Sequence, residues 1–228
     1  MHDVATFVMV STDKAVNPRS VMGASKRLAE LALLRWSSPR SPMRAVRLGN
    51  VLGSQGSVVP LFLQQIAAGG PVTVTHPEVN RYFTSLDEAV ELVLLTASLD
   101  GESGIFIPNP GEPVRIRELA ERMIKEAGFK GGSEMAIVMT GLRPGDKMHE
   151  EFVSEFEEVD ATGNAMLHLI KTSQPAQEEF DSQMTDLKDK VGRRDLAGVL
   201  GQICRLVPEY RPSELVLEAA KQQQSSSV

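Results

Sequence analysis

Short apolar runs alternate with longer amphipathic stretches along the first part of the chain. Residues 6–10, TFVMV, form a β-branched and apolar run that ends in a polar cluster at residues 11–14. This pattern predicts a buried strand followed by a loop. From Val21 to Trp36 apolar residues recur at helical spacing, which predicts an amphipathic helix. Pro39 and Pro42 then break the chain.

The same alternation continues to about residue 140. It predicts strands at 43–51, 72–74, 104–107 and 134–139, and helices at 58–68, 86–98 and 117–127. Ser85 and Glu88 have the spacing of a capping box at the start of the helix at 86–98. Beyond residue 150 no period is clear up to 174, and residues 178–190, 194–206 and 212–221 predict helices. Strands that alternate with helices predict an α/β fold with a largely parallel sheet.

Composition and charge narrow the class of protein. The chain has 228 residues, of which 42% are apolar, and a net charge of −6. It can therefore build a core, and it shows no basic stripe for nucleic acid. No apolar stretch approaches the ~20 residues that span a bilayer, and the N-terminus lacks a signal-peptide pattern, so we expect a soluble, cytoplasmic chain without membrane insertion. One cysteine excludes an internal disulfide, and the four histidines lack metal-ligand spacing, so we expect no metal site.

A cluster of chemically active residues follows the first predicted strand. Residues 11–14 read Ser-Thr-Asp-Lys, and Met22 and Lys26 lie four apart on one face of the next predicted helix. Short-chain dehydrogenases arrange their site in this way, with a Tyr-x-x-x-Lys pair on the helix. Met22 stands at the tyrosine position and has no titratable proton. Taken alone, Met-x-x-x-Lys is more often a core residue and a surface lysine, and Asp13-Lys14 a solvated pair in a turn.

The surrounding sequence resembles the CapD-like polysaccharide biosynthesis proteins, which are UDP-N-acetylhexosamine 4,6-dehydratases of the extended short-chain dehydrogenase type. Matching blocks occur in the family's order at residues 11–18, 22–27, 47–60, 70–77, 81–83, 141–147 and 207–212. Together they span nearly the whole chain, so the match is far more specific than any single motif. A methionine at the tyrosine position is also found in the branch of larger, retaining dehydratases.

The resemblance implies catalytic roles for the cluster. In such a dehydratase hydride passes from C4 of the sugar to NAD, the C5 proton is removed, the C6 hydroxyl leaves as water, and hydride returns to C6. By resemblance Asp13 is the acid, Lys14 is the base, and Lys26 contacts the nicotinamide ribose. Because Met22 removes the usual base for the C4 hydroxyl, the candidates for that base are Thr12 as a relay, Asp13, Lys14 or an ordered water.

The resemblance also implies binding positions. The cofactor is NAD, with NADP as the alternative, and its expected contacts are Ser11, Lys26, Leu48 and Val51. The substrate is a UDP-N-acetyl sugar, and its expected contacts are Asn50, Ser57, Val58, Arg81 and Arg143 around the diphosphate and Asp146 at the ribose. Family members often have glutamate where Asp146 stands. They also often associate, so a homo-oligomer is expected, and larger relatives carry an N-terminal membrane region, so a membrane-associated parent protein is an open alternative.

One part of a dinucleotide site is missing from the sequence. No Gly-x-Gly-x-x-Gly or Gly-x-x-Gly-x-x-Gly follows a strand. We therefore expect an incomplete Rossmann-like parallel sheet without its N-terminal β-α-β half at 1–113, a smaller α/β substrate-binding lobe with C-terminal helices at 114–221, and a disordered tail at 222–228. The functions left open are an NAD-dependent 4,6-dehydratase for surface polysaccharide, a related 4-epimerase, and a truncated, non-catalytic sugar-nucleotide-binding fragment. The Asp13-Lys14 pair favours dehydration, because epimerisation needs no C5 base.

Overall fold

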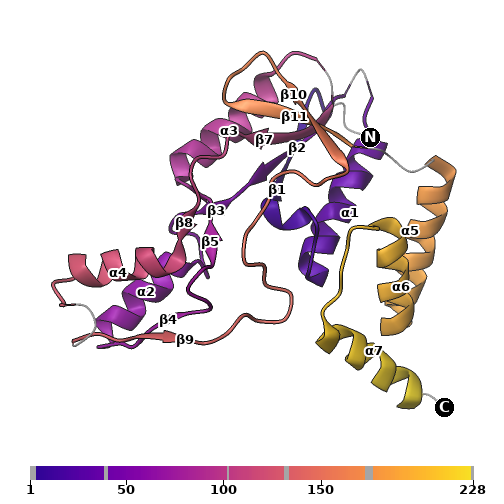
Figure 1. Cartoon of the computed structure of the whole chain (residues 1–228). Helices are drawn as coiled ribbons and strands as arrows, with labels where there is room; N and C mark the ends of the chain where they lie inside the picture. The colour runs from indigo at the N-terminus through magenta and orange to yellow at the C-terminus, as the bar shows by residue number, and fades with distance from the viewer. Residues whose placement is uncertain (1–3, 39–40, 102, 131–133, 173–176, 227–228) are drawn as a thin grey trace.

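A five-stranded sheet forms the centre of the molecule (Figure 1). The computed structural model describes residues 4–38, 41–101, 103–130, 134–172 and 177–226. The sheet has the order β1-β2-β7-β11-β10, with β1 (Phe7–Thr12), β2 (Met43–Leu48), β7 (Gly104–Pro108), β10 (Glu157–Ala161) and β11 (Leu167–Thr172). β1, β2 and β7 are parallel, whereas β11 and β10 join antiparallel. The expected α/β class with a parallel sheet is confirmed, and two antiparallel strands extend that sheet.

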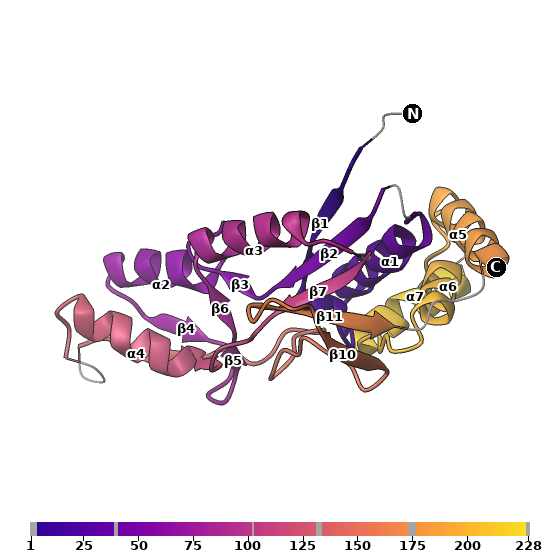
Figure 2. The same ribbon diagram turned by 90° about the horizontal axis from the view of Figure 1, so that it is seen from above.

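Helices cover both faces of the parallel strands (Figure 2). On one face α1 (Val21–Arg35) packs Leu33 and Leu34 against Ala45 and Ile105 of the sheet. On the other face lies α3 (Leu86–Ser98), whose Ala89 and Leu92 share an apolar cluster with β2 and β7. Double coverage explains why every residue of β7 is buried. The capping box at Ser85 and Glu88 is confirmed, with both reciprocal hydrogen bonds formed.

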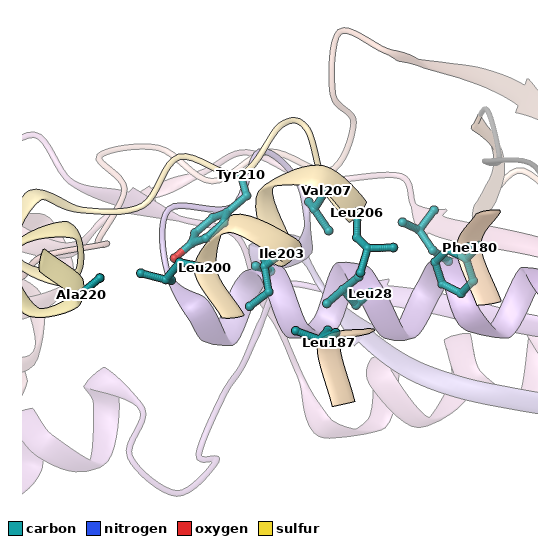
Figure 3. Close-up of a cluster of buried hydrophobic side chains, with 11 residues drawn as sticks. Leu28, Phe180, Leu187, Leu200, Ile203, Leu206, Val207, Tyr210 and Ala220 are labelled. Atoms are coloured by element: carbon teal, nitrogen blue, oxygen red, sulfur yellow. The ribbon is translucent and has the colours of Figure 1, made fainter. Parts of the chain in front are cut away.

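A second helical layer lies outside α1. It consists of α5 (Gln177–Gly192), α6 (Leu196–Leu206) and α7 (Glu214–Ser226). Figure 3 shows Leu28 of α1 beside Ile203 and Leu206 of α6, with Phe180 and Leu187 contributed by α5. Burying one such side chain stabilises the fold by about 1.5–3 kcal/mol, so this cluster fixes α1 firmly in place.

A smaller lobe extends from the main sheet. It is built from α2 (Val58–Ala67), α4 (Ile116–Glu126), β4 (Val72–Val74) and β9 (Ile137–Met139), which share a separate apolar core that includes Phe62 and Ile124. Two short strand pairs lie between this lobe and the sheet (Figure 1): β3 (Asn50–Val51) with β6 (Phe83–Thr84), and β5 (Asn80–Arg81) with β8 (Val114–Arg115).

The packing differs from the three-part division expected from the sequence. The lobe combines residues 58–74 with 116–139, whereas β10, β11 and the C-terminal helices pack on the main sheet and on α1. Residues 222–226, expected to be disordered, continue α7, and residues 227–228 lie outside the described part. The side chain of Gln223 explains this order, because it accepts from the amide of Leu196 and donates to the carbonyl of Arg194, both at 2.8 Å.

The expected strand at 43–51 is divided in two at Gly49. The backbone of Gly49 passes so close to Tyr82 that an added Cβ would lie 2.8 Å from the Tyr82 carbonyl oxygen. The chain therefore leaves β2 there, and Asn50 pairs with Phe83 in the small sheet instead. This change of partner carries Asn50 away from the main sheet, near the end of β1.

Candidate active site

Three consecutive residues at the carboxyl end of β1 form a hydrogen-bonded set. Thr12 caps the short 3-10 helix Asp13–Ala15, and its Oγ1 donates to Asp13 Oδ1 at 2.9 Å. The Lys14 Nζ donates to the same carboxylate oxygen at 2.8 Å. Asp13 is fully buried, whereas the side chain of Lys14 is 31% exposed. These residues lie at the carboxyl end of a parallel strand, where α/β sheets place their sites.

Two residues from distant parts of the chain complete the surroundings of Lys14. Its Nζ donates to Asn50 Oδ1 at 2.9 Å and lies 3.9 Å from Glu150 Oε1. The structure thus brings predicted Asn50 to the predicted Asp13-Lys14 pair. Glu150 was not predicted from the sequence, and its only signal was its position next to the block 141–147.

Glu150 is a buried carboxylate among three cations. Besides Lys14, its oxygens lie 3.6 Å from Arg81 Nε and 3.6 Å from Lys147 Nζ. Burial first, and the charge of Asp13 second, raise the pKa of Glu150 above its usual value. Burial also lowers the pKa of Lys147 despite the nearby carboxylates. Both pKa shifts disfavour the charged forms of these side chains. The attraction between Glu150 and Lys147 therefore does not fully offset the cost of burying their charges.

A cleft of about 250 Å³ opens beside this cluster. Lys14, Met22, Arg81, Asp146 and Glu150 are among its lining residues. Ser20 caps α1 and places Met22 in its first turn, where the side chain is 50% exposed. Lys26 follows one turn later and is also exposed, so both project from the same side of α1. The cleft therefore joins the start of α1, the residues after β1 and the segment at 144–150.

The two arginines predicted to bind the substrate, Arg81 and Arg143, differ in their surroundings. Arg81 donates to the backbone carbonyls of Asn80, Met148 and Lys147, so its guanidinium is engaged by protein in this structure. Arg143 is exposed, and its amide donates to Asp146 Oδ2 at 3.1 Å, which closes the turn before the cleft. Phosphate contacts by the two arginines remain a prediction.

The other predicted residues do not line the cleft. The hydroxyl of Ser11 is buried and donates to Glu30 at 2.6 Å. Leu48 is buried against α3, and Val51 is partly buried in β3. Val58 begins α2 after the N-cap Ser57, whose hydroxyl is buried without a hydrogen-bond partner in the described part of the chain. A cofactor or diphosphate role for this group remains a prediction.

A buried ion-pair network behind the site was missed by sequence reasoning. Arg47 is fully buried and donates to both oxygens of Glu30 and of Glu157, at 2.8–2.9 Å. Arg27 joins this network through Glu30, Glu157 and Glu209. Although burial raises it, hydrogen bonds from Arg47 hold the pKa of Glu157 below its usual value. The network ties α1 to β2, to the start of β10 and to the segment after α6.

A metal site and a membrane span would each need a recognisable feature within the described ranges. There, no group of three or more histidine, cysteine, aspartate or glutamate residues is placed to hold a metal ion. No helix within those ranges has the length and apolar character needed to cross a bilayer.

Comparisons with known proteins identify the family of this chain. The family model for polysaccharide biosynthesis proteins matches residues 1–172. The capsular polysaccharide biosynthesis protein CapD of Staphylococcus aureus is 48% identical over 157 residues, which cover 68% of this chain and 26% of that protein. A UDP-glucose 4-epimerase of Rickettsia typhi is 37% identical over 155 residues, which cover 66% of this chain and 44% of the epimerase.

A solved structure supports the same fold. The X-ray structure of Pen from Bacillus thuringiensis aligns with a TM-score of 0.67 and 27% identity, covering 80% of this chain and 62% of Pen. The chain belongs to the polysaccharide biosynthesis protein family, and its match with CapD spans about a quarter of CapD's length.

Proposed function

We propose that this chain carries the elimination site of an NAD-dependent 4,6-dehydratase, acting on a UDP-N-acetylhexosamine for surface polysaccharide. One observation supports this proposal above the others. Thr12, Asp13 and Lys14 form a hydrogen-bonded set at the carboxyl end of β1, beside a cleft that Met22 also lines. An elimination needs an acid and a base close together, and this set supplies both.

The residues at the nicotinamide end of the site fit NAD. Lys26 is exposed one helical turn after Met22, on the side of α1 that borders the cleft. We assign its ammonium to the ribose of the nicotinamide nucleotide. NAD, when bound, accepts hydride from C4 of the sugar and returns it to C6. Ser11 fits less well, because its hydroxyl already donates to buried Glu30.

Proton transfer can follow the hydrogen bonds of the set. The C4 hydroxyl proton passes through Thr12 Oγ1 to Asp13, which the hydroxyl already contacts at 2.9 Å. Asp13 then gives that proton to the C6 hydroxyl, which leaves as water. Lys14 in its neutral form removes the C5 proton and returns it to C5 when hydride reaches C6. The sugar loses one water and both side chains end as they began, so Asp13 serves in place of the base that Met22 lacks.

Two other functions have support of their own. A 4-epimerase is favoured by the similarity to the Rickettsia typhi protein. Sugar-nucleotide binding without turnover is favoured by the absence of a glycine-rich pyrophosphate motif from the printed sequence. Dehydration accounts best for Lys14, since 4-epimerisation leaves the C5 proton of the sugar in place and needs no base there.

Product analysis separates these functions. The purified chain is incubated with NAD and UDP-N-acetylglucosamine, both alone and joined behind the Gly-x-x-Gly-x-x-Gly unit of a relative. The expected product is the 4-keto-6-deoxy sugar nucleotide, lighter than the substrate by one water, with turnover at least ~100-fold lower in Lys14→Met. Lys125→Met on the exposed side of α4 is the matched control.

The products distinguish the dehydratase from the epimerase and from the non-catalytic fragment. UDP-N-acetylgalactosamine in place of the keto sugar would identify an epimerase. Product from the isolated chain would exclude a non-catalytic fragment. If neither form of the chain makes the keto sugar, the dehydratase proposal is wrong.

A further inference from the structure

The carboxylate of Glu150 has fewer close hydrogen-bond donors than the carboxylate of Glu157, which is also buried. Glu157 receives two hydrogen bonds at 2.8 Å from Arg47. The nearest cations to Glu150 lie at 3.6–3.9 Å, and its Oε2 has no hydrogen-bond partner in the described part of the chain. A buried carboxylate without close donors costs stability, and such groups are kept mainly where a site uses them.

The position of Glu150 links it to Lys14. The ammonium of Lys14 donates to Asp13 and Asn50, and Oε1 of Glu150 lies 3.9 Å from the same nitrogen. Opposite charges at such distances favour the protonated form of an amine. Arg81 and Lys147 are the other cations facing Glu150, and both approach it from outside the Asp13-Lys14 segment.

We infer that Glu150 is a positioning residue of the proposed active site, which holds Lys14 in the cleft and sets the pH at which Lys14 gives up its proton. The inference rests on the proposed role of Lys14 as the C5 base. In that reaction Lys14 must be neutral when the substrate is bound, because only a neutral amine can remove the C5 proton. A carboxylate that influences the protonation of Lys14 therefore influences when elimination can begin.

Competitive acetylation of lysines tests this inference on the chain itself. The chain is treated with trace isotope-labelled acetic anhydride across pH 6–11, a range chosen to bracket amine titration. Mass spectrometry of the Lys14 peptide gives the labelling rate, with exposed Lys125 on α4 as the internal reference. Lys14 is accessible to the reagent, since 31% of its side chain is exposed.

Removing the Glu150 charge should make Lys14 easier to deprotonate. In Glu150→Gln the pH of half-maximal labelling should fall by about one unit, so that labelling below it is about tenfold faster. Asp13→Asn removes the nearer counter-ion, at 2.8 Å, and should give a larger shift. Glu151→Gln makes the same charge change at an exposed neighbour that binds Asn17, and should give none.

The result that overturns the inference is a folded Glu150→Gln chain whose Lys14 labels like the wild type. If that variant does not fold, Glu150→Asp decides, because it keeps the charge but withdraws it by one methylene and should give a smaller downward shift. Labelling needs neither NAD nor sugar nucleotide. A chain that shows the shift but makes no keto sugar therefore refutes the dehydratase and retains the link between Glu150 and Lys14.

Discussion

Arg47 holds together two carboxylates that the fold buries almost completely. Its guanidinium donates four hydrogen bonds to Glu30 and Glu157, and a fifth to the carbonyl of Phe152. Substitution of Arg47 by Met keeps the apolar stem but leaves Arg27 as the remaining cation of the network beside the two carboxylates. Breaking a buried ion pair in this way costs about 3–5 kcal/mol.

That cost is large compared with the total stability of a domain, about 5–15 kcal/mol. For a chain of this size it corresponds to a fall in Tm of roughly 6–20 °C. Urea unfolding at pH 7.5, followed by circular dichroism, measures it directly. Arg193→Met is the control, because its pair with Asp189 is exposed and should contribute less than about 0.5 kcal/mol.

A second variant tests the cause of the loss. If uncompensated charge is responsible, replacing Glu30, Arg47 and Glu157 together by apolar residues of similar size should cost less than Arg47→Met alone. The reasoning would be refuted if the free energy of unfolding of Arg47→Met lay within about 1 kcal/mol of the wild-type value. It would also be refuted if the triple variant were less stable than Arg47→Met.

Three further changes test other parts of the structure. Hydrogen bonds from Arg47 hold the pKa of Glu157 below its usual value, so the charged carboxylate of Glu157 stabilises the fold. This stabilisation is fully present above the pKa that Glu157 has in the unfolded chain, and it is lost as pH falls through the pKa in the folded chain. Glu157→Gln should therefore flatten the acid side of a Tm-against-pH curve. Gly49→Ala places a Cβ 2.8 Å from the carbonyl oxygen of Tyr82 and should cost about 1–3 kcal/mol in urea unfolding. Ser85→Ala removes the cap of α3 and should cost ~1 kcal/mol by the same measurement, whereas no loss would show that the capping box is redundant.

Local patterns explain what the sequence could predict. β1, α1 and the cap of α3 follow from apolar spacing and capping residues within a few positions of each other. Thr12, Asp13 and Lys14 were singled out through the family resemblance, which rests on their consecutive positions and on Met22 in the next helix, and their catalytic roles remain a prediction. The hydrogen bonds among these three residues join neighbours in the sequence, whereas the bond from Lys14 to Asn50 spans 36 positions and left no local signal.

Long-range pairing explains what the sequence could not predict. The partly exposed residues of β10 and β11 give no clean alternation, so the place of these strands in the main sheet depends on the pairing of β11 with β7 and of β10 with β11. Arg47 lies within a buried strand, where its charge gives no local hint of Glu157, more than a hundred residues later. Glu150 reaches Lys14 only because the segment after β9 returns to the end of β1.

Glu150 and Glu157 lie a few residues apart, yet the fold treats their charges in opposite ways. Burial and Asp13 raise the pKa of Glu150, so its ionisation costs stability, and that cost grows as pH rises from the unfolded value through the folded one. Glu150→Gln should therefore hold or raise the Tm at pH 8 relative to the wild type, with a smaller difference at pH 4, whereas Glu157→Gln should lower it at pH 8. Scanning fluorimetry of both variants at the two pH values measures this contrast. A loss of stability at pH 8 in Glu150→Gln as large as that in Glu157→Gln would show that Glu150 is structural, because a carboxylate that supports folding must stabilise the protein in its charged form.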